Sequence, residues 1–340
     1  MEEINGKNSL AKKIPKIVEE IRSNPPKEIN FAYQKNISFS QMSIFRSCAY
    51  RWKLQYKDKI KRFNSSIHTV FGTAIHEVMQ HYLDVAYENS FAHADRNIDM
   101  EEFFQEKFIG EYQKQYKSNK NEHFSSAEEM REFFEDGIAI LEWFKKKRSK
   151  YFTKKGTYLV GCEIPIVIAP NKMLNNVLYM GYLDVVTYCE TTDTFKIIDI
   201  KTSTKGWSSY DKKNEDKHFQ LILYKKFFSE QYGIPLDKIE IEFLIVKRKV
   251  LDWDDEKIMS PHQAYRVQQF VPPSGKIKIN RASNAVNDFI TECFSSSGKI
   301  KEIEYPKSPS KWNCSFCPYG EDKNYVEPNN IFRNFLYTYI

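Results

Sequence analysis

The residues with the clearest capacity for chemistry lie on two neighbouring apolar runs in the middle of the chain. Residues 195–201 alternate apolar and polar side chains, which predicts a β-strand, and this run carries Asp199 and Lys201. Because residues two apart on a strand point to the same face, the carboxylate and the ammonium group lie together. Residues 177–186 predict the partner strand of a hairpin and carry Asp184.

Two carboxylates that converge repel each other and lose hydration, at a cost that a cation between them would offset. Carboxylate oxygens are ligands that suit Mg²⁺ or Mn²⁺. The alternative is a surface ion pair between Asp199 and Lys201, which contributes little to stability. A helix predicted from residue 218 favours the functional interpretation, because it places Gln220 and Tyr224 four residues apart on one face.

Two further residues are candidates for the same site. A helix predicted at 69–87 carries His76 after small residues that start at Gly72, which would let another backbone or a ligand approach closely. A single histidine on such a helix is more often a buried core residue than a ligand. Glu163 interrupts an apolar run, so it either faces the site or lies on a sheet edge close to Pro165.

The helices and strands that must position these residues can be predicted from the hydrophobic periodicity of the sequence. Helices are predicted at about 7–22, 40–56, 69–87, 100–117, 126–148, 218–228 and 276–294, and strands at about 157–168, 177–186, 195–201, 239–247 and 264–271. Ser40 is the predicted N-cap of the second helix, segment 23–37 a linker or edge segment, and segment 202–216 a polar loop. This order predicts an α/β (α+β) fold with a mixed central sheet flanked by helices and a helical N-terminal part.

The composition excludes a disordered chain. Of the 340 residues, 41% are hydrophobic and 15% aromatic, so a packed core can form. The net charge of +6 permits a polyanionic partner without requiring one. The polar N-terminus lacks the apolar stretch of a secretory signal, and no apolar run reaches the length of a membrane span. We therefore expect a cytoplasmic protein without a membrane partner, located in the host cell cytoplasm if the chain is viral.

Taken in order, the motifs resemble the PD-(D/E)XK nuclease superfamily in its RecB-type exonuclease branch, to which CRISPR-adaptation and phage recombination nucleases belong. The motifs are a Ser-x-Ser helix start with Cys48, Gly72-x-x-x-His76, Gly181-x-x-Asp184, Asp199-Ile-Lys201, Gln220-x-x-x-Tyr224 and Cys314-x-x-Cys317-Pro. Each motif is weak alone, but their order over residues 38–320 and the hairpin spacing make the signal specific. The resemblance implies a restriction-endonuclease-like core that hydrolyses phosphodiester bonds in DNA.

The resemblance also implies roles for the motif residues. The implied catalytic residues are Asp184, Asp199, Lys201, Gln220 and Tyr224, and the implied ligands of Mg²⁺ or Mn²⁺ are His76, Asp184, Asp199 and the backbone carbonyl of Ile200, with Glu163 as a further candidate. The nitrogen of His76 would favour Mn²⁺. Lys201 would position or help to deprotonate the attacking water, whose pKa the metal lowers. Gln220 and Tyr224 would orient the DNA strand or the lysine.

The cysteine motif departs from the iron–sulfur members of this branch. Those members carry four cysteines, one upstream and three near the C-terminus. In this chain Cys48, Cys314 and Cys317 match three of them, but residues 318–340 contain no cysteine that could be the fourth. A [4Fe–4S] cluster normally takes four thiolates. Three alternatives stay open: a cluster with one non-cysteine ligand, a zinc site with an extra ligand, or reduced thiols without a metal, since a disulfide is not expected in a reducing compartment.

The helix predicted at 40–56 mixes aromatic and basic side chains that suit single-stranded DNA, namely Arg46, Arg51, Trp52 and Tyr56. The alternative, about as well supported, packs Trp52 and Tyr56 into the core. The implied partners are DNA, as single strands or duplex ends, and a helicase or recombination protein. Any unwinding would come from that partner, because the chain has no Gly-x-x-x-x-Gly-Lys-Ser/Thr motif.

We divide the chain into an N-terminal helix and linker (1–37), a helical part with Cys48 and His76 (38–156), a nuclease core (157–300) and a C-terminal cysteine loop and tail (301–340). The expected function is a divalent-metal-dependent DNA nuclease, an exonuclease on ends or single strands in recombination, repair or phage DNA processing. One alternative is a non-catalytic DNA-binding subunit with the same fold, which is disfavoured because every catalytic motif residue is present. The other is an unrelated α/β protein whose motifs match by chance.

Overall fold

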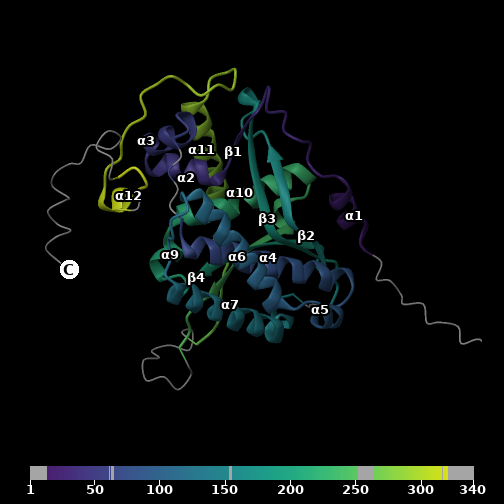
Figure 1. Cartoon of the computed structure of the whole chain (residues 1–340). Helices are drawn as coiled ribbons and strands as arrows, with labels where there is room; N and C mark the ends of the chain where they lie inside the picture. Colours follow the sequence, from purple (N-terminus) through teal and green to yellow (C-terminus); the bar gives the residue numbers. More distant parts are fainter. Residues whose placement is uncertain are drawn as a thin grey trace, which may run out of the picture.

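A mixed β-sheet forms the centre of the protein in a computed structural model (Figure 1). The structure describes residues 14–60, 62, 65–152, 155–251, 264–315 and 317–320. Within these ranges the six strands are β1 (Lys35–Ile37), β2 (Thr157–Ile168), β3 (Val177–Cys189), β4 (Thr194–Ser203), β5 (Ile239–Lys247) and β6 (Val267–Phe270). Their order across the sheet is β1-β3-β4-β5-β6, and β2 pairs with β3.

The branch point of the sheet is β3. Along one of its edges β2 runs antiparallel, pairing with residues 179–189. The opposite edge is shared, because β1 pairs parallel with residues 177–179 and β4 pairs antiparallel with residues 185–189. Among the described residues no strand covers this edge at 180–184, and Asp184 lies where the pairing with β4 stops.

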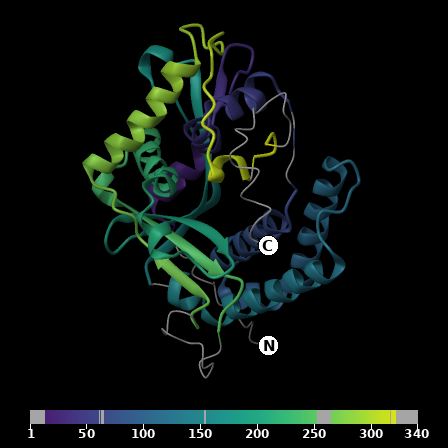
Figure 2. The same ribbon diagram turned by 90° about the vertical axis from the view of Figure 1, so that its left-hand side faces the viewer.

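Helices cover both faces of the sheet (Figures 1 and 2). One face packs against α4 (Ile67–Glu88), α6 (Met100–Ser118) and α7 (Ala127–Lys147), and the other against α1 (Lys16–Ser23), α2 (Phe39–Ser47), α3 (Ala49–Trp52), α10 (Glu215–Tyr232) and α11 (Lys276–Cys293). Shorter helices are α5 (Phe91–Asn97), α8 (Ser149–Phe152), α9 (Ser209–Lys213), α12 (Lys311–Ser315), a π-helix (Lys53–Lys57) and two 3-10 turns (Lys172–Leu174 and Leu236–Lys238). The predicted α/β fold with a mixed sheet flanked by helices is confirmed. None of the described helices combines the length and the apolar character needed to cross a membrane.

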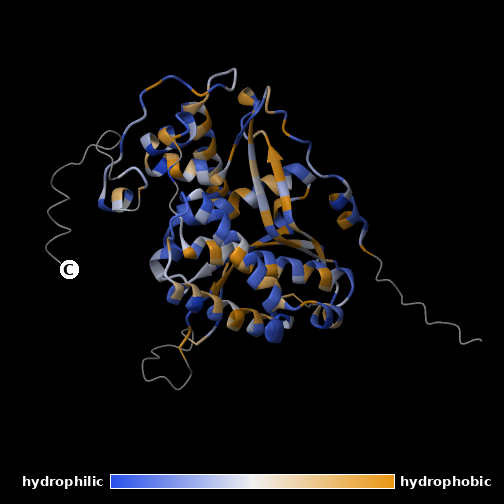
Figure 3. Ribbon diagram, in the orientation of Figure 1, coloured by the Kyte–Doolittle hydropathy of each residue, from blue (hydrophilic) through white to orange (hydrophobic). Residues whose placement is uncertain are grey.

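The strands are apolar on both sides because both faces of the sheet are covered. Ile198 and Ile200 of β4 belong to the hydrophobic cluster under α4, α6 and α7, as their predicted orientation toward the core requires. Ile197 belongs to the cluster on the α10 side, and Asp199 shares that side by the two-residue period. Figure 3 shows hydrophobic residues along the strands and hydrophilic residues over the outer surfaces of the helices.

The connection between the parallel strands β4 and β5 is α10, which must therefore cross one face of the sheet. Its first turn is capped by the Asn214 side chain, which accepts a hydrogen bond from the Asp216 N–H at 3.1 Å. Its C-terminus is Gly233 in the left-handed region (φ 67°), a conformation that glycine adopts without steric cost. This crossover presents one face of α10 to β3 and β4.

Several predicted boundaries need correction. Ser38 rather than Ser40 caps α2, because the Ser38 hydroxyl accepts the Gln41 N–H at 3.3 Å. The single helix predicted over 40–56 breaks at Cys48, where the backbone is extended, and resumes as α3 and the π-helix. The predicted linker contains β1, the predicted loop contains α9, and α5 was not predicted. The weak first helix begins only at Lys16, and residues 1–13 lie outside the described residues.

Candidate active site

Asp184 lies where β3 and β4 separate. Their ladder ends at Val185 opposite Ile198, so the next pair in register would be Asp184 and Asp199. In place of a backbone pair, the Ile200 N–H donates a hydrogen bond to Asp184 Oδ2 at 2.8 Å. The Asp184 carboxylate is therefore held by the strand that carries the other motif residues.

The face of β4 under α10 presents Asp199 and Lys201, as the two-residue period predicts. Lys201 Nζ lies 2.8 Å from Asp199 Oδ2. Asp199 is only 1% exposed, and neither of its oxygens accepts a well-aligned hydrogen bond from the described residues. The alternative of a surface ion pair is therefore wrong, because the carboxylate is buried and only the charge of Lys201 offsets its burial.

The facing side of α10 supplies Gln220 and Tyr224. Lys201 Nζ donates to Gln220 Oε1 at 3.3 Å, and Gln220 Nε2 donates to the Tyr224 hydroxyl oxygen at 3.1 Å. Gly181 of β3 makes room for this arrangement, since a Cβ atom there would lie 2.7 Å from Tyr224 Cε1. The two predicted motif residues of α10 are thus brought to the lysine of β4.

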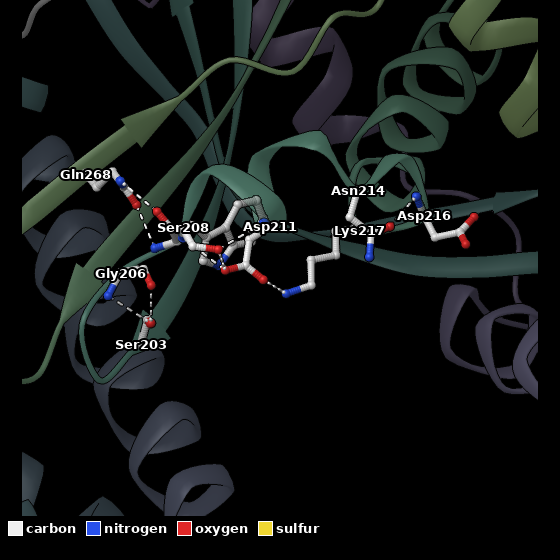
Figure 4. A network of polar contacts seen from close by, with 9 residues as sticks. Ser203, Gly206, Ser208, Asp211, Asn214, Asp216, Lys217 and Gln268 are labelled. Atoms are coloured by element: carbon white, nitrogen blue, oxygen red, sulfur yellow. Dashed lines mark hydrogen bonds and ion pairs between the residues drawn. The ribbon is translucent and has the colours of Figure 1, made fainter. Parts of the chain in front are cut away.

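A network of polar contacts holds the segment between β4 and α10 (Figure 4). Gln268 of β6 bonds twice to the backbone of Trp207: its Oε1 accepts the N–H at 2.8 Å and its Nε2 donates to the carbonyl at 3.1 Å. Asp211 completes the capping box of α9, and Lys217 of α10 donates to Asp211 Oδ1 at 2.5 Å. These contacts keep the start of α10 in place relative to β4.

The carboxylate pair is electrostatically unfavourable when both members are charged. Burial raises the pKa of Asp184 well above its usual range, and the nearby charge of Asp199 raises it further. Burial also raises the pKa of Asp199, against the lowering effect of Lys201. Burial alone would lower the pKa of Lys201, but the two carboxylates raise it above its usual value. The pair therefore favours a bound proton or cation, while Lys201 stays an ammonium group.

His76 of α4 reaches the same carboxylate. Its Nδ1 lies 3.6 Å from Asp184 Oδ2. Burial, together with the charge of Lys201, lowers the pKa of His76 to about 4, so the ring is neutral at neutral pH and its contact with Asp184 is not an ion pair. Gly72 shows the predicted close approach, since a Cβ atom there would lie 3.1 Å from Thr202 Oγ1 of β4. A neutral imidazole beside a carboxylate is a candidate metal ligand.

The residues present fit a divalent cation that takes few protein ligands. Asp184 and Asp199 supply carboxylate oxygens at adjacent positions, and those of Asp199 lack hydrogen-bond partners among the described residues. Within that same part of the chain, no group of three or more His, Cys, Asp or Glu residues is arranged to hold a metal ion. A cation here would complete its shell with water, backbone carbonyl or phosphate oxygens, as Mg²⁺ commonly does.

Gln80 is a residue of this site that the sequence analysis missed. It follows His76 by one turn of α4, and its Nε2 donates to Glu163 Oε1 at 2.6 Å and to the Asp184 carbonyl oxygen at 3.0 Å. Its spacing of four residues from His76 was the available signal. Glu163 therefore lies beside the site and binds Gln80, and its role as a metal ligand stays a prediction.

The predicted DNA-binding residues are placed in different environments. Trp52 is fully buried among aromatic residues of α11 and the segment that follows it, so its ring has no free face for a base. Core packing, the alternative interpretation, accounts for Trp52, and Tyr56 lies half-buried against it. Arg46 is exposed and pairs with Asp216 at 2.9 Å, while Arg51 lines a small cavity near the C-terminal segment.

That cavity, of about 100 Å³, is also lined by Cys48, Cys314 and Cys317. Asn313 Nδ2 donates to the Ser47 carbonyl oxygen at 2.8 Å, which ties the C-terminal segment to the end of α2. A cluster held by four thiolates does not fit, because no fourth cysteine lines the cavity. Burial raises the pKa of the Cys317 thiol, which disfavours the thiolate form. Whether the three thiols hold a metal stays a prediction.

Comparison with known proteins bears on the expected family. The family model described as the PD-(D/E)XK nuclease superfamily matches residues 36–321. No curated protein matches this sequence. Solved structures that match include a crystal structure from Eubacterium rectale whose description proposes an exonuclease; it is 11% identical, with 91% of this chain and 96% of that chain covered and a TM-score of 0.48. Because the family model spans most of its length, the chain belongs to the PD-(D/E)XK nuclease superfamily.

Proposed function

We propose that this chain is a divalent-metal-dependent deoxyribonuclease, an exonuclease that acts on DNA ends or single strands in recombination, repair or phage DNA processing. Membership of the superfamily supports a nuclease, and PD-(D/E)XK nucleases use divalent metals, typically Mg²⁺ or Mn²⁺. DNA as the substrate, cleavage from the ends and dependence on a divalent metal go beyond membership of the superfamily and are proposed for this chain.

The observation that carries the proposal is the row of contacts from Asp199 through Lys201 and Gln220 to Tyr224, beside Asp184. A purely structural hairpin would not bury Asp199 without a well-aligned hydrogen bond from the described residues, since buried polar groups are almost always paired. Perturbed carboxylates that gather next to a lysine are typical of catalytic sites.

Each side chain has a role that follows from its contacts. A divalent ion at Asp184 and Asp199, with His76 as a further ligand, would lower the pKa of a bound water and neutralise charge on the phosphate. Lys201 keeps its proton because its pKa is raised, so it suits electrostatic stabilisation of the phosphate better than proton abstraction. Gln220 accepts a hydrogen bond from Lys201 and is in turn held by the Tyr224 hydroxyl.

The alternative of a non-catalytic DNA-binding subunit receives no support from the geometry, because the motif residues are in mutual contact. A helicase or recombination protein belongs to the proposal as a partner that would supply unwinding, since the sequence has no Gly-x-x-x-x-Gly-Lys-Ser/Thr motif.

The test is cleavage of end-labelled single-stranded and duplex DNA and of closed circular DNA, each with Mg²⁺, Mn²⁺ or EDTA. We expect shortening of linear DNA from its ends with metal, none in EDTA, and intact circles. Lys201→Met should lose cleavage but keep DNA binding, whereas Lys205→Met, an exposed lysine in the next loop, should cleave normally. Cut circles would refute the exonuclease mode, and DNA binding without cleavage in any metal would support the binding-subunit alternative.

A further inference from the structure

One helix contacts both the side chain and the backbone of Asp184. His76 and Gln80 lie one turn apart on α4 and so share a face. His76 Nδ1 is 3.6 Å from the Asp184 carboxylate, and Gln80 Nε2 donates to the Asp184 carbonyl oxygen at 3.0 Å. The second contact reaches the main chain of Asp184, at the residue next to Val185, where the ladder with β4 ends.

Glu163 adopts a left-handed backbone conformation that is unusual within a strand. In the ladder of β2 and β3 it stands opposite Asp184, between the pairs Cys162–Val185 and Ile164–Leu183. Its φ is +51°, in the left-handed region that non-glycine residues rarely occupy within a strand. Such outliers persist where surrounding contacts impose them, often at functional sites.

The contact that accompanies this conformation is the hydrogen bond from Gln80 Nε2 to Glu163 Oε1 at 2.6 Å. A carboxylate only accepts hydrogen bonds, so it requires the Gln80 amide to present its NH₂ group in this direction. The two hydrogens of that group then serve Glu163 and the Asp184 carbonyl. Gln80 is buried, so its NH₂ group is shielded from water, whereas Glu163 itself is exposed.

We propose that Gln80, oriented by Glu163, is a positioning residue that holds the backbone of Asp184 so that its carboxylate stays beside the Ile200 amide and His76. In this arrangement Glu163 acts through Gln80 rather than as a metal ligand. The inference rests on the proposed function for its kinetic consequence, whereas the positioning itself is a property of the metal-free protein.

The first test replaces Gln80 by methionine, which has a similar shape and no donor. We expect kcat to fall at least tenfold while KM for DNA changes less than twofold, because DNA binding does not involve this contact and small displacements of reacting groups cost rate steeply. Amide hydrogen exchange of Ile200 in EDTA should speed up, since its acceptor on Asp184 is no longer fixed. Glu77→Gln, an exposed neighbour on α4, is the matched control and should change neither quantity.

The second test separates positioning from a structural role. Glu163→Gly relieves the left-handed strain and should melt at the same temperature as the parent or above it. A merely structural residue would then leave kcat unchanged, whereas we expect the same loss as in Gln80→Met. Glu163→Gln should recover most of that loss, because its amide oxygen can accept from Gln80.

The proposal is overturned if Gln80→Met and Glu163→Gly both keep the parent's kcat and the parent's Ile200 exchange rate. If Gln80→Met does not fold, Glu163→Gly decides alone. If the parent shows no cleavage with any metal, the proposed function fails, and the exchange of Ile200 in the variants still supports or refutes the positioning.

Discussion

Replacing Asp199 by asparagine should stabilise the metal-free protein while abolishing cleavage. Asp199 is 1% exposed, and its oxygens lack well-aligned hydrogen bonds from the described residues. Its pKa is raised by burial even though Lys201 opposes the effect. At neutral pH the folded state therefore holds a charge that its surroundings disfavour, and asparagine keeps the shape of the side chain without that charge.

The size of this change in stability depends on Lys201, the ion-pair partner of Asp199. Removing one partner of a buried ion pair usually destabilises a protein because the other charge is left unpaired. Here the Lys201 side chain is one-third exposed and the Asp184 carboxylate remains beside it, so we expect a net gain of about 1–2 kcal/mol in the free energy of unfolding. That corresponds to a rise in Tm of about 1.5–3 °C for a chain of 340 residues. The folded pKa of Asp199 lies above its unfolded value, so the carboxyl is protonated in both states below about pH 4 and costs nothing there. The parent loses stability relative to the variant as pH rises through the folded pKa, so the gain should be largest at neutral pH and vanish in acid.

The assay is thermal unfolding in EDTA between pH 4 and pH 8, with Asp211→Asn as the control. Hydrogen bonds from Lys217 and Ser208 lower the pKa of Asp211 to about 2, so its charge favours the fold and its loss should cost about 1 kcal/mol at neutral pH. Saturating Mn²⁺, at about 100 times Kd, should then stabilise the parent by about 2.7 kcal/mol and Asp199→Asn by much less, which reverses their order. If Asp199→Asn melts at or below the parent in EDTA at pH 7, the argument from buried charge is wrong.

Three further outcomes are expected. Gly181→Ala should lower both kcat and stability, the latter by about 1–3 kcal/mol in denaturant titration, because its Cβ would lie 2.7 Å from Tyr224 Cε1; an unchanged midpoint would contradict this close packing. His76→Ala should weaken Mn²⁺ binding in calorimetry more than it lowers Tm; a collapse of Tm at unchanged affinity would make His76 a core residue. Asn313→Ala should lower Tm through the loss of its hydrogen bonds to the Ser47 and Ser308 carbonyls, by about 1–2 kcal/mol, and more than Cys314→Ser does. The opposite order, together with stoichiometric iron or zinc in elemental analysis, would show that a metal holds this segment.

Much of the candidate site could be predicted from the sequence because its spacings are local. Asp199 and Lys201 share a face through the two-residue period of a strand, and Gln220 and Tyr224 share one through the helical period. Both periods are properties of backbone hydrogen bonding, so they hold whatever packs around them. The hairpin that brings Asp184 next to Asp199 is likewise a short-range feature. The alternation of strands and helices determined the fold class for the same reason.

Only the tertiary structure decided which of these groups are buried and what else touches them. Gln80 reaches Glu163 and Asp184 across 83 and 104 residues of sequence, and no local pattern records such contacts. Trp52 had two interpretations until the position of α11 enclosed its ring. The raised pKa of Asp199 likewise arises from burial by α10 and the sheet, not from its neighbours in sequence. Burial depends on how elements far apart in the sequence pack together. The type and local spacing of a residue contain no information about that packing.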